Sequence, residues 1–258
     1  MSQRRPRSLK HEYELYVEEE IENYKESVPR QALLAIGDEA VAVLALDSQL
    51  SLTEMLLCEE VDRLIFRRLR LPTYETWKRR RLKAAAELRR PERWGLTADA
   101  PVVRTVVPSA DGPVLVAGAG TEGSALLLAA YGRDVLTIGK EEDALLRVLS
   151  EAEAAGLSQR VRALVGDLGS FKSEVPLRAV VCSLSALASL TKSERARALA
   201  LLKDATADGG VHVVEGGGPI GGRSRSVLNE LVASYAGWRV SIEGGADSGT
   251  FVAYKDVA

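Results

Sequence analysis

The sequence predicts an all-helical N-terminal domain followed by an α/β domain with a mostly parallel, seven-stranded sheet. Three observations lead to this fold class. Apolar residues recur every three or four positions through residues 1–96, which is the period of an amphipathic helix. From residue 113, short apolar runs alternate with amphipathic segments, as in a parallel sheet covered by helices on both faces. A glycine-rich turn, residues 118–123, separates the first apolar run from a helix-like segment.

The composition is that of an ordinary globular protein. Hydrophobic residues make up 46% and charged residues 27% of the 258 residues, and the net charge is -2, so overall charge indicates neither a nucleic-acid nor a membrane partner. No apolar run approaches the roughly 20 residues that span a bilayer. The first residues are basic but have no apolar segment after them, so we expect that they are not a secretory signal. Cys58 and Cys182 lie in apolar stretches, which predicts two reduced core thiols in a cytoplasmic protein. With two cysteines and two histidines, we expect no metal site.

Four amphipathic helices with short connections are predicted for the N-terminal domain, which makes a small bundle. They are expected over residues 9–28, after Pro29, from the capping-box sequence of residues 51–54, and between Pro72 and Pro91. Residues 97–112 are predicted to be a linker that contains a short strand. The predicted domains are therefore residues 1–96 and 97–258.

Lysine and arginine far outnumber acidic residues over residues 67–93. A basic face of this kind can bind the phosphates of a nucleic acid. The first helix is rich in glutamate, however, and no aromatic residues are interleaved for base stacking. A solvated face that pairs with the first helix is therefore the favoured interpretation, and a weak nucleic-acid contact through this stretch is disfavoured.

The α/β domain is predicted element by element from apolar runs and helix signals. Strands are expected at residues 114–117, 135–138, 161–165, 179–182, 211–215, 238–242 and 250–254. Helices are expected at residues 121–131, 141–155, from the capping box at Thr191 to Asp204, and after the glycine-rich loop of residues 216–222. The last two strands are joined by a short turn, so only the final strand is predicted to run antiparallel, in a terminal β-hairpin.

The glycine turn carries the most specific chemical signal in the sequence. Val114–Ala117 leads into GAGTEG, which has the GxGxxG spacing in its required strand–helix context. Such a turn lets the backbone N–H groups at the start of a helix approach a nucleotide-like ligand. The carboxyl ends of the other parallel strands meet at the same edge of the sheet, where ligands bind in folds of this class.

Residues 100–258 resemble class I S-adenosylmethionine-dependent methyltransferases, which have a Rossmann-like fold. The resemblance rests on five segments in order: VLVAGAGTEG, LTIGKEEDAL, VRALVGDLGSF, AVVCSLSALASL and TADGGVHVVEG, with the terminal hairpin after them. It implies that S-adenosylmethionine, or S-adenosylhomocysteine as the product, is the cofactor. Asp167 and Leu168 then correspond to the pair that meets the adenine, and Gly118 and Gly120 to the methionine-side turn. The cofactor-binding residues that it implies are Gly118, Ala119, Gly120, Gly123, Gly139, Lys140, Glu141, Asp167, Leu168 and Ser183.

Two positions depart from the pattern of that family. Its members usually carry an acid before the glycine turn, which reaches the amino group of methionine, whereas this chain has Val116. They usually end the second strand with an acid that binds the ribose hydroxyls, whereas this chain has Gly139, with Glu141 and Glu142 just beyond it. Acids at the start of a helix are also favoured by the helix dipole alone.

The resemblance implies an enzyme that transfers a methyl group in line to an unidentified acceptor, which is either a small molecule or a macromolecule. No catalytic residue is assigned, because the histidine within strand five, His212, has the pattern of a packed residue. The first alternative is a non-catalytic scaffold that has lost cofactor binding with its acids. The second, an NAD(P)-dependent oxidoreductase, is disfavoured by the missing acid after strand two and by the terminal hairpin. The glycine-rich loop of residues 216–222 is expected to be a lid over the acceptor site.

Overall fold

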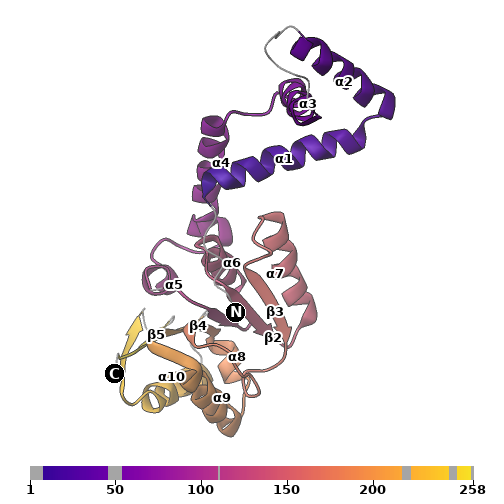
Figure 1. The fold of residues 1–258 in the computed structure, drawn as a ribbon. Coiled ribbons are helices and arrows are strands. Elements are labelled where there is room, and N and C mark those ends of the chain that lie inside the picture. The colour runs from indigo at the N-terminus through magenta and orange to yellow at the C-terminus, as the bar shows by residue number, and fades with distance from the viewer. Residues whose placement is uncertain (1–7, 46–53, 110, 217–221, 244–248, 257–258) are drawn as a thin grey trace. The chain divides into compact units, whose positions relative to one another are not determined.

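The computed structural model describes residues 8–45, 54–109, 111–216, 222–243 and 249–256 (Figure 1). The contacts within the chain divide it into two compact units, Met1–Ala84 and Ala85–Ala258, called here the helical unit and the α/β unit. This division falls earlier than the predicted boundary after residue 96. Two features attach the intervening residues to the α/β unit: Arg89 donates a hydrogen bond to the carbonyl of Ala130, and Trp94 packs against that unit's core.

The helical unit contains the predicted helices, at α1 (Leu9–Ser27), α2 (Arg30–Ala45), α3 (Glu54–Leu69) and the first part of α4 (Tyr74–Leu88). Residues 51–53 of the predicted capping box lie outside the described residues. The buried core comes from α1, α2 and α3, through Ile21, Ile36, Ala40, Leu64 and Ile65.

Helix α4 joins this unit differently, because it has no buried residue. Tyr74 and Trp77 on α4 each lie 5.5 Å from the ring of Tyr13 on α1, measured between ring centroids. Arg81 on α4 forms an ion pair with Glu12 on α1, at 3.5 Å. Aromatic contacts and charge therefore hold α4 to α1.

The α/β unit is built around a seven-stranded sheet in the order β3-β2-β1-β4-β5-β7-β6. The strands are β1 (Val114–Ala117), β2 (Val135–Gly139), β3 (Val161–Val165), β4 (Leu177–Ser183), β5 (Thr206–Glu215), β6 (Trp238–Glu243) and β7 (Thr250–Lys255). Only β7 runs antiparallel, since it pairs antiparallel with both β5 and β6 while the pairs among β1 to β5 are parallel. The structure confirms the predicted mostly parallel sheet with its terminal hairpin.

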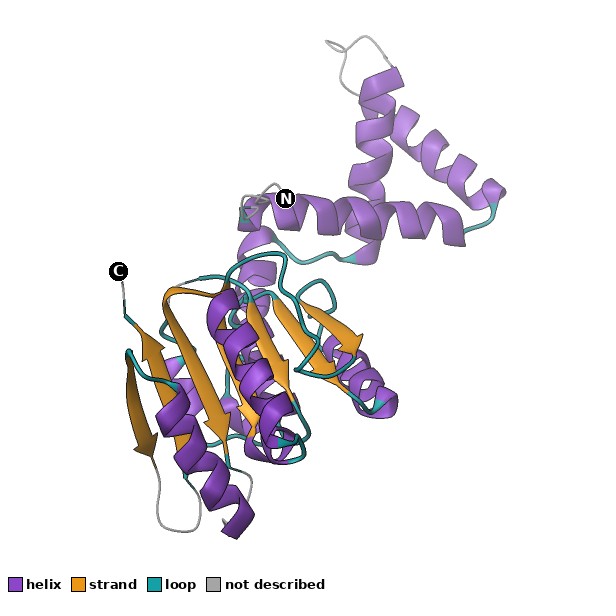
Figure 2. Ribbon diagram, turned by 90° about the horizontal axis from the view of Figure 1, so that it is seen from below, coloured by secondary structure: helices purple, strands orange, loops and turns teal. Residues whose placement is uncertain are grey.

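Helices cover both faces of the sheet (Figure 2). On one face α5 (Pro101–Thr105), α6 (Glu122–Ala130) and α7 (Glu142–Ala154) pack on the valines of β1, β4 and β5. On the other, α8 (Leu184–Ala188), α9 (Lys192–Ala205) and α10 (Gly222–Ser234) pack on alternate residues of the same strands. Both faces of the central strands are buried, so these strands read as continuous apolar runs.

Three sequence expectations were wrong. Residues 101–105 form helix α5 instead of a short strand, because Pro101 occupies the first helical position and Val102 and Val106 pack into the core on one side. A short helix, α8, follows β4 where no helix was expected. Cys58 is exposed on α3, whereas Cys182 is buried as predicted. None of the described helices is both long and apolar enough to cross a membrane.

Candidate functional site

An open cavity of about 290 Å³ lies at the carboxyl edge of the sheet. It adjoins the boundary between β1 and β4, where the strand order reverses and where sheets of this class bind ligands. Its walls are the glycine turn, the end of β2 with the start of α7, the loop after β3, and α8. Seven of the predicted site residues line it, namely Gly118, Ala119, Gly139, Lys140, Glu141, Asp167 and Leu168.

The glycine turn is closed by a side-chain hydrogen bond. Thr121 donates a hydrogen bond from its hydroxyl to the carbonyl of Gly118, at 2.7 Å. Gly118 has a φ of 95°, and a Cβ there would lie 2.2 Å from Oγ of Ser183 and 2.7 Å from Cβ of Ala186. Only glycine therefore lets the end of β1 approach the start of α8 this closely.

The other two glycines of the motif differ from the first. Gly120 has a φ of 87°, and a Cβ there would have no neighbour within 4 Å. A Cβ on Gly123 would lie 2.1 Å from the carbonyl oxygen of Trp94, so this glycine allows α6 to pack against the 3-10 helix Pro91–Trp94. Both glycines line a neighbouring hollow with Trp94 and not the main cavity.

At the end of β2, Gly139 stands where the methyltransferase family usually has an acid. A Cβ at this position would lie 3.6 Å from Leu145, an ordinary van der Waals distance, so packing does not exclude a side chain here. Glu141, the N-cap residue of α7, is exposed at the cavity wall and makes no capping hydrogen bond with its side chain. Glu142 belongs to the first turn of α7 and is not part of the wall. The structure thus places Glu141, but not Glu142, in the cavity lining.

The loop after β3 presents one polar and one apolar residue. Asp167 accepts a hydrogen bond on Oδ1 from the N–H of Gly169, at 2.8 Å, which orients its carboxylate. Leu168 is buried in the core beside Ile138 and also lines the cavity. A carboxylate next to an apolar surface suits a flat, heteroaromatic group that carries hydrogen-bond donors on its rim.

Ser183 does not line the cavity, although the resemblance implied that it does. Its hydroxyl caps α8: Oγ accepts a hydrogen bond from the N–H of Ala186, at 3.2 Å, and lies 3.0 Å from Oγ of Ser185. Helix α8 contributes Ser185 and Ala186 to the wall, and Ser189 and Leu190 just after it also line the cavity. The prediction missed them because a helix of five residues is too short to show helical periodicity.

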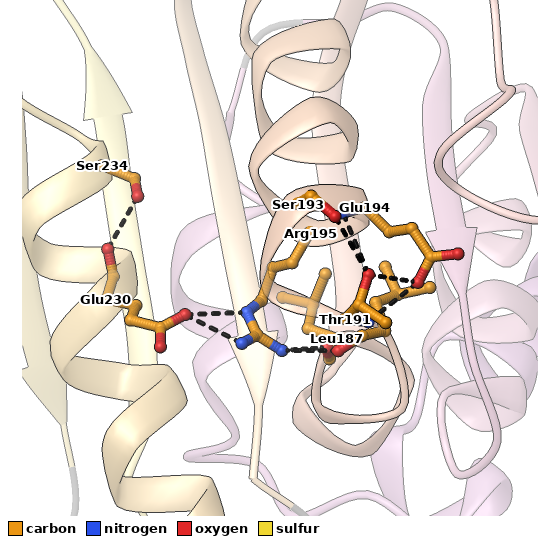
Figure 3. Close-up of polar contacts among 8 residues, drawn as sticks. Leu187, Thr191, Ser193, Glu194, Arg195, Glu230 and Ser234 are labelled. Carbon is orange, nitrogen blue, oxygen red and sulfur yellow. Dashed lines mark hydrogen bonds and ion pairs between the residues drawn. The ribbon is translucent and has the colours of Figure 1, made fainter.

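Arg195 on α9 holds α8 in place behind the cavity. Its guanidinium donates from Nη1 to the carbonyls of Leu187, at 2.8 Å, and Leu190, at 3.0 Å. The same group donates from Nε and Nη2 to Oε2 of Glu230 on α10, at 3.0 and 2.8 Å (Figure 3). Arg195 is only 8% exposed, so its charge is largely removed from water, and the Glu230 carboxylate balances it. This single side chain connects α8, α9 and α10.

Replacing Arg195 with methionine is expected to lower the free energy of unfolding by about 3 kcal/mol, because it leaves the Glu230 carboxylate and two carbonyls without their donor. Urea denaturation followed by circular dichroism measures the change. The matched control is Arg197→Met, two residues along the same helix, where the arginine is exposed and the expected change is below about 0.5 kcal/mol. Equal stability of the two variants would contradict a structural role for Arg195.

Glu215, at the end of β5, is a carboxylate that the sequence reasoning missed; neither it nor its partner Ser124 is part of the cavity wall. The hydroxyl of Ser124 on α6 donates to its carboxylate, with Oγ at 3.3 Å from Oε1 and 3.2 Å from Oε2. Burial raises the pKa of Glu215 to about 7, against a smaller lowering by Ser124. Burial, together with the charge of Glu215, raises the pKa of the Cys182 thiol to about 12. The thiol is therefore un-ionised near neutral pH and unsuited to nucleophilic chemistry.

His212 is a packed residue, as the sequence suggested. It is 1% exposed, and its ring nitrogens lie 2.7 Å from Oγ1 of Thr206 and 2.6 Å from Oη of Tyr235. His212 is not part of the cavity wall. Among the described residues, no group of three or more His, Cys, Asp or Glu side chains is arranged to hold a metal ion.

No protein-family model matches the sequence, and no curated protein matches it significantly. Several solved structures do match. The glycopeptide N-methyltransferase MtfA, crystallised with S-adenosylhomocysteine, is 19% identical with a TM-score of 0.49, and the match covers 62% of this chain and 89% of that one. The CcbJ methyltransferase of Streptomyces caelestis is 17% identical with a TM-score of 0.49, covering 61% and 88%. An rRNA methylase of Streptococcus thermophilus is 14% identical with a TM-score of 0.46, covering 58% and 90%. Identities this low carry no information on the substrate.

Proposed function

We propose that the α/β unit binds S-adenosylmethionine and transfers its methyl group to an acceptor that is not yet identified. The observation that carries the proposal is the cavity itself. It lies at the β1–β4 boundary and brings together the glycine turn, Glu141 and the pair Asp167-Leu168 from three separate loops. These are the segments in which the sequence resembles the methyltransferase family.

The residues present fit the parts of this cofactor. The apolar wall with Asp167 suits the adenine, and Glu141 offers a carboxylate for the ribose hydroxyls in place of the acid missing at Gly139. The turn at Gly118 adds backbone atoms to the wall of the same cavity. When bound, the cofactor supplies an activated methyl group, and the protein's task is to hold it in line with the acceptor.

The two alternatives differ from this proposal in specific ways. Dinucleotide-binding sheets have strand order 3-2-1-4-5-6, whereas here the antiparallel β7 lies between β5 and β6. This order and the absence of an acid at Gly139 disfavour an NAD(P)-dependent oxidoreductase. A scaffold that has lost cofactor binding has no need of an open cavity, nor of an exposed Glu141 in its wall whose side chain makes no capping hydrogen bond. Binding measurements decide between the scaffold and the methyltransferase.

Isothermal titration calorimetry of the intact chain with S-adenosylhomocysteine tests the proposal. We expect binding by the wild type, and a loss of roughly 10- to 100-fold in affinity for Glu141→Gln, since a charge-assisted hydrogen bond contributes about 1.5–3 kcal/mol. The control Glu142→Gln alters the neighbouring acid outside the cavity wall and should bind like the wild type. A folded wild type that gives no binding heat even at millimolar ligand would instead support the scaffold alternative.

A further inference from the structure

Glu215 lies on the same face of the sheet as Val116, the position at which the methyltransferase family usually has an acid. Val116 is in register with Val181 of β4, and Val181 with Val213 of β5. All three pack on the α6 face of the sheet. Side chains alternate along a strand, so Glu215, two residues beyond Val213, projects from this same face at the carboxyl edge. The hydrogen bond from Ser124 on α6 agrees with that placement.

The carboxylate of Glu215 has few partners for a buried charge. An ionised carboxylate offers about four acceptor positions, and the Ser124 hydroxyl, which is itself fully buried, supplies one hydrogen. Among the residues whose side chains the structure describes, which leave out 221–225, no lysine, arginine or histidine forms an ion pair with Glu215. Glu215 is partly buried, and burial raises its pKa. Because removing a carboxylate from water without a cation is costly, this position favours a cationic ligand group.

The position of Ser124 relates this carboxylate to the cavity. Ser124 is the third residue of α6, directly after the glycine turn, and Thr121 and Glu122 at the start of that helix line the cavity. Glu141 and Asp167 line the same cavity as Thr121 and Glu122, so a ligand with its adenosine end beside Glu141 and Asp167 can place its other end at the first turn of α6. The methionine tail of S-adenosylmethionine carries one ammonium group and one carboxylate at that end.

We propose that Glu215 binds the α-ammonium group of the cofactor's methionine tail and replaces, from β5, the acid that β1 lacks at Val116. This inference rests on the proposed function. Ser124 then acts as a positioning residue, because its hydroxyl holds the carboxylate against α6. The ammonium supplies a countercharge to this carboxylate, so the raised pKa of Glu215 is expected to fall on binding.

A pair of ligands that differ in one group tests this interaction. Calorimetry on the intact chain compares S-adenosylhomocysteine with its deamino analogue, in which hydrogen replaces the α-amino group. For Glu215→Gln, which keeps the shape and the hydrogen bond to Ser124, we expect a loss of about 10- to 100-fold in affinity for S-adenosylhomocysteine. The deamino analogue should bind the wild type and Glu215→Gln equally well. The control Glu153→Gln changes an exposed acid on α7 and should alter neither affinity.

The outcomes separate this inference from the proposed function. If the wild type binds S-adenosylhomocysteine and Glu215→Gln binds it equally tightly, the role of Glu215 is overturned while the proposed function stands. Glu122→Gln alters the acid in the first turn of α6. If this variant, and not Glu215→Gln, loses affinity for S-adenosylhomocysteine while binding the deamino analogue normally, the ammonium partner is Glu122 and the inference is wrong. If the wild type binds neither ligand, both the inference and the proposed function fail.

Discussion

Replacing Gly123 with alanine is expected to lower the free energy of unfolding of the α/β unit by about 2 kcal/mol. The added Cβ would lie 2.1 Å from the carbonyl oxygen of Trp94. This neighbour is backbone, so the 3-10 helix Pro91–Trp94 or α6 has to shift, and overpacking of this kind costs about 1–3 kcal/mol or more. Alanine is the better helix former by about 1 kcal/mol at most. The steric cost is the larger effect.

The measurement is urea denaturation monitored by circular dichroism, with Gly166→Ala as the matched control. A Cβ on Gly166 would meet Ile138 at 3.6 Å, an ordinary contact, and this glycine has no positive φ. We expect the control to stay within about 0.5 kcal/mol of the wild type. If both variants are equally stable, then α6 does not pack against Trp94 as described, and Gly123 would regain a place among the ligand-binding candidates.

Acidification is expected to destabilise the α/β unit through His212. Thr206 donates its hydroxyl hydrogen to the carbonyl of Leu202, at 2.6 Å, so it accepts from Nε2–H of His212, and Nδ1 accepts from the hydroxyl of Tyr235. Both nitrogens of the neutral imidazole ring therefore have a hydrogen-bond partner. Burial, with smaller contributions from Lys203 and Lys255, lowers the pKa of His212 to about 3.

The sign follows from proton linkage. Below pH 6.5 the unfolded chain protonates this histidine while the folded chain does not, so stability is lost as the pH falls from 6.5 toward 3. At pH 4 the loss from this group is about 3 kcal/mol. Glu215 acts in the opposite direction between about pH 4.5 and 7, because its raised pKa makes the folded state bind the proton more tightly than the unfolded state.

The two groups therefore offset each other in the wild type between about pH 4.5 and 6.5. In Glu215→Gln the histidine contribution is no longer opposed, so stability should begin to fall already below pH 6.5. The midpoint of urea denaturation at half-unit steps from pH 4 to 8 measures both profiles. His11→Gln serves as the control, because this histidine is exposed on α1 and its removal should not change the profile. Parallel profiles for the wild type and Glu215→Gln would contradict the raised pKa of Glu215.

Much of the fold could be read from local patterns. The strand at Val161–Val165 and the capping box at Thr191 occur where they were predicted, since alternation, apolar runs and capping are properties of neighbouring residues. The parallel sheet and its antiparallel last strand followed from the alternation of strands with helices and from the short final turn. Local patterns failed at α5 and α8, which have five residues each. Helices this short are stabilised by packing and capping more than by periodicity.

The sequence by itself determined where the glycine turn occurs along the chain, because a glycine turn after a buried strand has few structural alternatives. Only the tertiary structure showed why glycine is required at two positions of the turn. Gly118 lies close to Ser183 and Gly123 lies close to Trp94, and both partners are distant in the sequence. It also placed Glu215 on the α6 face with Ser124, more than ninety residues earlier in the chain. Such relations depend on strand register and helix packing between distant segments. They arise only when the chain has folded, so no local pattern contains them.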